Sequence, residues 1–200
     1  MTTTERLPMV TRADWVPGPK QGRWTYADYA ALPDDVKRYE IVNGVLYMTP
    51  APSWFHQDVV GELFAYLRDH IRSADSGRVF VSPIDVELAP NAVFQPDVVV
   101  LLKASEHKLG EHHIIGAPDL VIEVTSPGTS RYDLREKQDA YARAGIPEYW
   151  VVNPDAHTIE VLVLDIASYV SLGVYRGKAT LPSQVLPEFA VPVEQFFVSG

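Results

Sequence analysis

The stretch PDLVIEVTSPG, residues 118–128, decides the fold because it is an apolar run that contains one acidic side chain in its middle. Side chains of a strand alternate between two faces, so Val121 and Glu123 share one face, and the other face is formed by Leu120, Ile122 and Val124. Burying an unpaired carboxylate costs several kcal/mol, so Glu123 must be protonated, paired or bound to a cation. The stretch therefore predicts a buried strand whose carboxylate has a partner elsewhere in the chain.

The partner of Glu123 is predicted to lie on a neighbouring strand. Asp119 lies on the same face but four residues away, which at ~3.3 Å per residue is about 13 Å. Side chains on adjacent strands stand only about 5 Å apart. Asp97 opens the preceding apolar run, FQPDVVVLL, and consecutive strands are commonly neighbours. We expect Asp97 and Glu123 to meet across two strands, whereas Asp119 is interpreted as the start of a strand after a proline.

Two further acidic residues are candidates for the same cluster. Asp85, in SPIDVEL, could add a third oxygen, and Glu40, in the predicted hairpin, could add a fourth. Clusters of oxygen ligands suit magnesium or manganese. An all-oxygen metal site around Asp97 and Glu123 is thus one reading of the sequence; the other is that Asp97, like Asp119, only begins a strand after a proline.

The rest of the chain indicates a mixed α/β (α+β) domain, with helices flanking one central mixed sheet. The Asn43-Gly44 pair predicts a hairpin over residues 38–49. Apolar residues at three- and four-residue steps predict a helix over residues 54–74, and a second is expected over residues 130–145, with Ser130 as N-cap. Residues 1–23 are expected to form an irregular arm and residues 24–200 a single domain. Further strands are predicted at residues 78–88, 97–102, 119–125, 148–153, 158–165 and 169–176.

Composition and charge limit the classes of function. The chain has 200 residues, of which 46% are hydrophobic and 22% charged, as in ordinary globular proteins. No stretch is apolar enough to span a bilayer and no apolar leader opens the sequence, so we expect a cytoplasmic protein without a membrane partner. Without cysteine, a metal site must use carboxylates or histidines. The net charge of −9 argues against a protein that coats nucleic acid nonspecifically.

Lys137 is the basic residue placed nearest to the predicted cluster. With Leu134 at 0° on a helical wheel, Tyr141 falls at about 340° and Lys137 at about 300°, at the border of the apolar stripe. A lysine at this position could extend along the apolar surface to solvent. Alternatively, its ammonium group reaches the carboxylates and stabilises charge that develops on a phosphate. Helix geometry favours neither reading over the other.

This combination of motifs resembles the PD-(D/E)XK nuclease superfamily. Its core is a Pro-Asp on one strand and a glutamate on the next, as in Asp97 and Glu123. The lysine that usually follows the glutamate by two positions is replaced by Thr125, but in some branches the next helix supplies it, where Lys137 is suitably placed. More specifically, the segments RYEIVNGVLY, HQDVVGELF, FQPDVVVL and GAPDLVIEVTSPGTSRYDLREKQDAYARAGIPEYWVVNP resemble the Uma-two type family of restriction endonucleases.

The resemblance implies a restriction-endonuclease-like fold and metal-dependent hydrolysis of phosphodiester bonds. Glu40, Asp97, Glu123 and Lys137 match the active-site positions of the family, with Asp97 and Glu123 as the magnesium ligands. His56 and Asp85 match its recurring pattern with less definite roles, as do Ser126 and Asp133. DNA is then the expected substrate, and dimers are expected by analogy with nucleases that cut two strands.

Two other classes of function stay open from the sequence. One is a nuclease fold without catalytic activity that acts as a binding module; the other is a metal-dependent hydrolase of small phosphate esters, which the acidic composition favours. A histidine-rich segment, EHKLGEHH, is interpreted as a polar loop rather than a metal site. A basic rim for DNA could come from one third of the chain, through Lys103, Lys108, Arg131, Arg135, Lys137 and Arg143.

Overall fold

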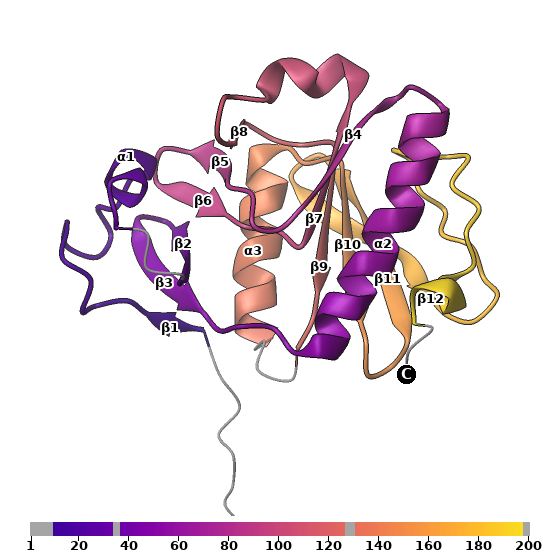
Figure 1. Cartoon of the computed structure of the whole chain (residues 1–200), viewed down its shortest axis with the longest axis horizontal. Coiled ribbons are helices and arrows are strands. Elements are labelled where there is room, and N and C mark those ends of the chain that lie inside the picture. Colours follow the sequence, from indigo (N-terminus) through magenta and orange to yellow (C-terminus); the bar gives the residue numbers. More distant parts are fainter. Residues whose placement is uncertain (1–9, 34–36, 127–130, 198–200) are drawn as a thin grey trace, which may run out of the picture.

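The computed structural model describes residues 10–33, 37–126 and 131–197, and for 131–133 only the backbone. Two six-stranded mixed sheets form the fold (Figure 1). The N-terminal sheet has the order β1 (Thr11–Arg12), β3 (Val45–Thr49), β2 (Arg38–Val42), β6 (Ala92–Phe94), β5 (Val86–Ala89) and β8 (Ile114–Ile115). The main sheet has the order β12 (Ser168–Tyr175), β11 (Thr158–Asp165), β10 (Glu148–Asn153), β9 (Leu120–Val124), β7 (Val98–Leu102) and β4 (Gly77–Val81).

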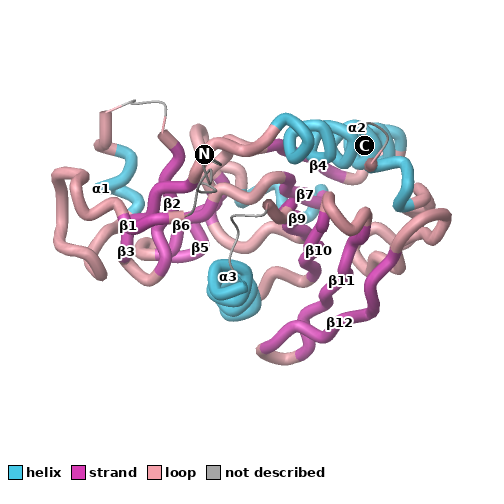
Figure 2. Tube along the Cα trace, turned by 90° about the horizontal axis from the view of Figure 1, so that it is seen from below, coloured by secondary structure: helices cyan, strands magenta, loops and turns pink. Residues whose placement is uncertain are grey.

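Two helices cover opposite faces of the main sheet (Figure 2). Helix α2 (Trp54–Ser73) buries its apolar stripe against Leu120, Ile122 and Val124 of β9. Helix α3 (Arg131–Ala144) packs Tyr141 with Val121 on the other face. The alternation predicted for the central strand is therefore confirmed. It follows that Glu123 points to the α3 side, because it shares a face with Val121.

Helix α3 also faces the N-terminal sheet, since Phe94 of β6 meets the Tyr141 ring edge to face with centroids 5.2 Å apart. The β2–β3 hairpin was predicted correctly. Asn43 and Gly44 both have positive φ, 50° and 74°, as a tight two-residue turn requires. The chain of contacts from β2 through α3 to β9 brings the two sheets together where the acidic residues lie.

The predicted fold class is confirmed. The prediction of one central sheet was wrong, because strands between residues 11 and 115 form a second sheet. The strand expected over residues 78–88 is two strands, β4 and β5, which belong to different sheets and are separated around Pro83. Short-range alternation continues across this break, so the sequence pattern could not reveal it. The loop expected after β7 contains a 3₁₀ helix, η1 (Lys103–Lys108), and β8.

The remaining elements are short. Helix α1 (Tyr26–Ala30) begins at the N-cap Thr25, and a 3₁₀ helix, η2 (Val193–Phe196), packs on α2. Within the predicted arm, β1 pairs with β3, and the division into an arm over residues 1–23 and a domain over 24–200 stays a prediction. The predicted cap of α3, Ser130 with Asp133, lies outside the described side chains. No helix of the described residues has the length and apolar character needed to cross a membrane.

Candidate active site

Asp97 lies immediately before β7, opposite Glu123 of the neighbouring antiparallel strand β9. The β7–β9 register pairs Val98 with Ile122, so one further step pairs Asp97 with Glu123. Both side chains are almost completely buried, with 6% of Asp97 and 8% of Glu123 exposed. Two carboxylates this deep in a protein require compensation. The predicted meeting of these residues across two strands is present in the structure.

Glu123 is held through one of its two oxygens. Its Oε1 accepts a hydrogen bond from the Tyr141 hydroxyl at 2.6 Å and from Lys137 Nζ at 3.0 Å. Both donors come from α3, where residues four apart share a face. Among the described residues, none donates to Oε2 of Glu123. The carboxylate is therefore fixed in orientation through Oε1, while the described residues leave Oε2 without a donor.

Asp97, like Glu123, is held through one of its two carboxylate oxygens. Its Oδ2 accepts a hydrogen bond from the backbone N–H of Val124 at 2.8 Å and lies 3.2 Å from His56 Nε2. His56 Nε2 is also 2.9 Å from the carbonyl oxygen of Val124. Burial alone would lower the pKa of His56, but the hydrogen bond and the charge of Asp97 raise it overall. No donor of the described backbone and side chains contacts Oδ1 of Asp97.

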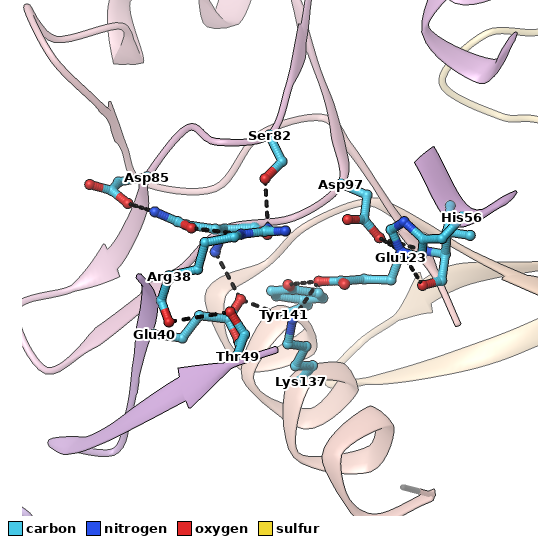
Figure 3. A network of polar contacts seen from close by, with 12 residues as sticks. Arg38, Glu40, Thr49, His56, Ser82, Asp85, Asp97, Glu123, Lys137 and Tyr141 are labelled. Carbon is cyan, nitrogen blue, oxygen red and sulfur yellow. Dashed lines mark hydrogen bonds and ion pairs between the residues drawn. The ribbon is translucent and has the colours of Figure 1, made fainter. Parts of the chain in front are cut away.

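Lys137 connects the two sheets. Its Nζ lies 2.9 Å from Glu40 Oε1 on β2 and 3.0 Å from Glu123 Oε1 on β9 (Figure 3). The same Glu40 oxygen accepts the backbone N–H of Gln95 at 3.0 Å. Lys137 is 18% exposed, so its ammonium group is not carried out to solvent. Of the two readings of the helical wheel, the structure has the one in which the ammonium reaches the carboxylates (Figure 3).

The electrostatics of this cluster follow from burial and crowding of like charges. Burial raises the pKa of Glu123 to about 7; the ammonium of Lys137 acts against this, while Asp97 and Glu40 add to it. Burial alone would lower the pKa of Lys137, but Glu123 and Glu40 raise it above its usual value. The cluster thus has three carboxylates and one firmly protonated lysine, and an added cation would relieve the excess negative charge.

The donor set fits a magnesium or manganese ion that keeps other ligands. Magnesium commonly binds through one or two carboxylates plus waters and substrate phosphates. Oε2 of Glu123 and Oδ1 of Asp97 supply two such oxygens. No three histidine, aspartate or glutamate side chains of the described residues are grouped so that one ion could bind them all. Water and substrate would therefore have to complete the coordination shell.

The other predicted residues are distributed as follows. His56 lies against Asp97, as described above. Asp85 is not joined to Asp97 or Glu123 by a hydrogen bond among the described residues; its Oδ1 accepts hydrogen bonds from Tyr29 at 3.1 Å and Gln95 at 2.8 Å. Asp119 binds the backbone N–H of Leu102 at 2.7 Å and the Ser105 hydroxyl, as a strand-start residue would.

Two members of the predicted basic rim make contacts away from the carboxylate pair. Lys103 pairs with Asp75, and Lys108 donates to the carbonyl of Ala117 at 2.6 Å. Arg135 and Arg143 are exposed on α3, and the side chain of Arg131 lies outside the described residues. In the histidine-rich segment, His113 pairs with Glu87 at 3.0 Å. The positive charge nearest to the carboxylates thus comes from Lys137 and not from the predicted rim as a whole.

Sequence reasoning missed Tyr141 as a site residue. Its place on the helical wheel indicated an apolar packing position, and its ring indeed packs in the core. The available signal was its spacing of four residues from Lys137, which places both side chains on one helical face. A tyrosine on an apolar stripe needs a partner for its hydroxyl, and here that partner is Glu123.

Comparison with known proteins relates the chain to a protein family and to a solved structure. A family model described as "Putative restriction endonuclease" matches residues 26–194. A crystal structure of a "putative nuclease belonging to DUF820" from Anabaena variabilis matches with a TM-score of 0.73 and 19% sequence identity, over 87% of this chain and 97% of that chain. The latter shows that the fold is shared. No curated protein matches the chain.

Proposed function

Because the chain belongs to the Uma2 family, described as "Putative restriction endonuclease", we propose that it is a magnesium-dependent endonuclease that hydrolyses phosphodiester bonds of DNA. One observation carries the proposal. Glu123 on β9 and Asp97 at the start of β7 stand opposite each other in the strand register, each fixed through one oxygen, and the described residues leave the second oxygen of each without a donor. This is the arrangement expected of two carboxylates that hold a divalent cation beside a phosphate.

Each residue then has a defined task. Glu123 and Asp97 would hold the cation, which when bound supplies Lewis-acid activation of the phosphate and of the attacking water. Lys137 would orient the water and stabilise negative charge on the phosphate in the transition state. Glu40 keeps the ammonium group in place and protonated, because it raises the pKa of Lys137. Tyr141 and His56 act through the carboxylates that they contact, as positioning residues.

The test is cleavage of duplex DNA by the purified protein with and without millimolar magnesium, over a range of salt concentrations. We expect cleavage that depends on magnesium and weakens steeply as salt rises, because binding of the DNA backbone releases counterions. Activity on a small phosphate ester with little salt dependence would instead indicate a phosphatase-like enzyme. A folded protein that binds neither magnesium nor DNA would contradict the proposal. Association into a homodimer and a cytoplasmic location stay predictions.

Magnesium affinity is expected to rise with pH. Glu123 must lose its proton to bind the cation, and its pKa without metal is about 7. Below pH 7 the affinity should therefore fall about tenfold per pH unit, and above pH 8 it should level off, as expected for one competing proton. Calorimetric titration with magnesium from pH 5.5 to 8.5 measures this dependence. An affinity that stays constant over this range would mean that Glu123 is not a ligand.

Replacing Tyr141 with phenylalanine is expected to shift the activity profile to higher pH. The hydroxyl of Tyr141 stabilises ionised Glu123, so its loss raises the pKa of Glu123 further. We expect about tenfold lower cleavage at pH 7, since hydrogen bonds to charged groups contribute about 1.5–3 kcal/mol, with recovery near pH 9. Tyr149→Phe is the matched control, because the buried Tyr149 hydroxyl has no hydrogen-bond partner among the described residues. Equal profiles for both variants would contradict the role of Tyr141.

A further inference from the structure

Arg38 is a second basic side chain near the carboxylates, and sequence reasoning did not single it out. It lies two residues from Glu40 on β2, so both side chains point to the same side of the strand. Its guanidinium group donates to Ser82 Oγ at 2.6 Å, to Gln95 Oε1 at 3.2 Å and to the Gln95 carbonyl at 3.2 Å. Figure 3 shows the guanidinium group held beneath Ser82.

The contacts of Arg38 leave part of its donor capacity unused. A guanidinium group has five N–H donors. Nε makes one of the three hydrogen bonds and one terminal nitrogen makes the other two. The two donors on the remaining terminal nitrogen meet no acceptor of the described residues. All acceptors of Arg38 are neutral, so its positive charge has no carboxylate partner within the described chain.

The position of the guanidinium group is fixed by groups that lead to the candidate active site. Ser82, which accepts from Arg38, donates its own backbone N–H to the carbonyl oxygen of Asp97 at 3.0 Å. Gln95, the other partner, donates its backbone N–H to Glu40 Oε1. Two consecutive hydrogen bonds, through Ser82, therefore link the Arg38 guanidinium group to the backbone of the predicted metal ligand Asp97. Two others, through Gln95, link it to the carboxylate of Glu40.

Gln95 is itself oriented by a second layer of contacts. Its side-chain nitrogen donates to Asp85 Oδ1 at 2.8 Å and to the Tyr29 hydroxyl at 3.1 Å. These bonds determine which end of the amide faces Arg38, so the oxygen is the end available to the guanidinium group. Asp85 thus acts on Arg38 through Gln95. A cation fixed in advance loses little conformational entropy when an anion binds.

We propose that Arg38 binds a backbone phosphate of the nucleic acid beside the bond that is cleaved; this inference rests on the proposed function. Arg38 is a partly buried, preorganised arginine next to a carboxylate cluster, in a protein of net charge −9. Two of its N–H donors have no acceptor among the described residues. A polyanion approaching Glu40, Asp97 and Glu123 needs local positive charge. Arginine binds phosphate oxygens through directed, charge-assisted hydrogen bonds.

The experiment measures DNA binding without cleavage. Binding of a fluorescent duplex is followed by anisotropy in EDTA, in the Glu123→Gln background, over 50–300 mM salt. Adding Arg38→Gln to this background should weaken binding about tenfold or more and reduce the slope of log affinity against log salt by about one, as expected for one lost phosphate contact. Arg38→Gln alone should leave magnesium affinity, measured by calorimetry, unchanged.

Two further variants separate phosphate binding from a structural role. Arg38→Lys keeps the charge but not the directed donors, so the salt slope should persist while affinity falls a few-fold. Arg78→Gln is the control, because Arg78 pairs with Glu106 and lies at the other end of β4, opposite Leu101 rather than Val98.

Three outcomes decide the inference. The inference is overturned if Arg38→Gln binds DNA with the same affinity as the parent and with the same slope of log affinity against log salt. This holds even if the variant unfolds at a lower temperature. If Arg38→Gln does not fold, Arg38→Lys decides, and an affinity equal to that of the parent overturns the inference. A parent protein that binds no DNA would contradict the proposed function, and a parent that binds DNA with no contribution from Arg38 would contradict this inference alone.

Discussion

Glu123→Gln is expected to reduce DNA cleavage by about three orders of magnitude or more, the scale of losing a preorganised electrostatic group in an active site. The substitution keeps the size of the side chain and removes its negative charge. Both Glu123 oxygens are affected: one is fixed by Lys137 and Tyr141, and the other is the proposed ligand oxygen. The variant should also lose most of its magnesium affinity, which calorimetry measures without reference to activity.

The second carboxylate offers an internally matched comparison. Asp97→Asn should cause a loss of cleavage and of magnesium affinity similar to that of Glu123→Gln. Asp119→Asn is the control, because Asp119 also follows a proline and also binds a backbone N–H, but contacts Leu102 and Ser105 instead. Asp119→Asn protein that is folded should cleave DNA at the same rate as the parent protein. Cleavage that survives either Glu123→Gln or Asp97→Asn would rule out the proposed site.

Lys137→Gln is expected to lower cleavage by about two to three orders of magnitude, since it removes the cation proposed to stabilise the transition state. The loss should appear in the rate at saturating magnesium and DNA, because Lys137 is not a proposed metal ligand. Arg143→Gln on the same helix is the control, since Arg143 is exposed to solvent. Cleavage in Lys137→Gln at the parental rate would contradict the assigned role.

The same variant should also change stability in a pH-dependent way. Removing one partner of a buried ion pair leaves uncompensated charge, so we expect a loss of about 3–5 kcal/mol at pH 8. Lys137 acts against the raised pKa of Glu123, and without it that pKa rises further above the unfolded value. A raised carboxyl pKa in the folded state makes stability fall as pH increases. Thermal unfolding should therefore occur at a higher temperature at pH 6 than at pH 8, more so than in the parent.

Much of the site could be predicted because its residues stand where local patterns are strong. Glu123 interrupts an apolar strand, Asp97 opens the preceding one, and Lys137 borders an apolar helical stripe; each position follows from strand or helix periodicity. The structure brings all three together with Glu40. Tyr141 was assigned only to packing. A helical wheel shows on which face of the helix a side chain lies, but it does not show which residue binds the tyrosine hydroxyl.

Other features depended on contacts between distant segments. Residues 78–88 were predicted as one strand, yet β4 and β5 enter different sheets. Asp85 was a candidate for a third oxygen of the cluster, and in the structure it binds the side chain of Gln95. Lys103 and Lys108 were assigned to a basic rim, but one pairs with Asp75 and the other with a backbone carbonyl.

The sequence by itself determined the strand and helix faces, the hairpin turn and the conflict of a carboxylate inside an apolar run, because these depend on interactions between residues close in the chain. Only the tertiary structure decided that a second sheet presents Glu40 to Lys137, and that Ser82 and Gln95 hold Arg38 near Asp97. The physical reason is that hydrogen bonds between distant segments depend on the relative placement of whole elements. Periodicity along the chain does not encode that placement.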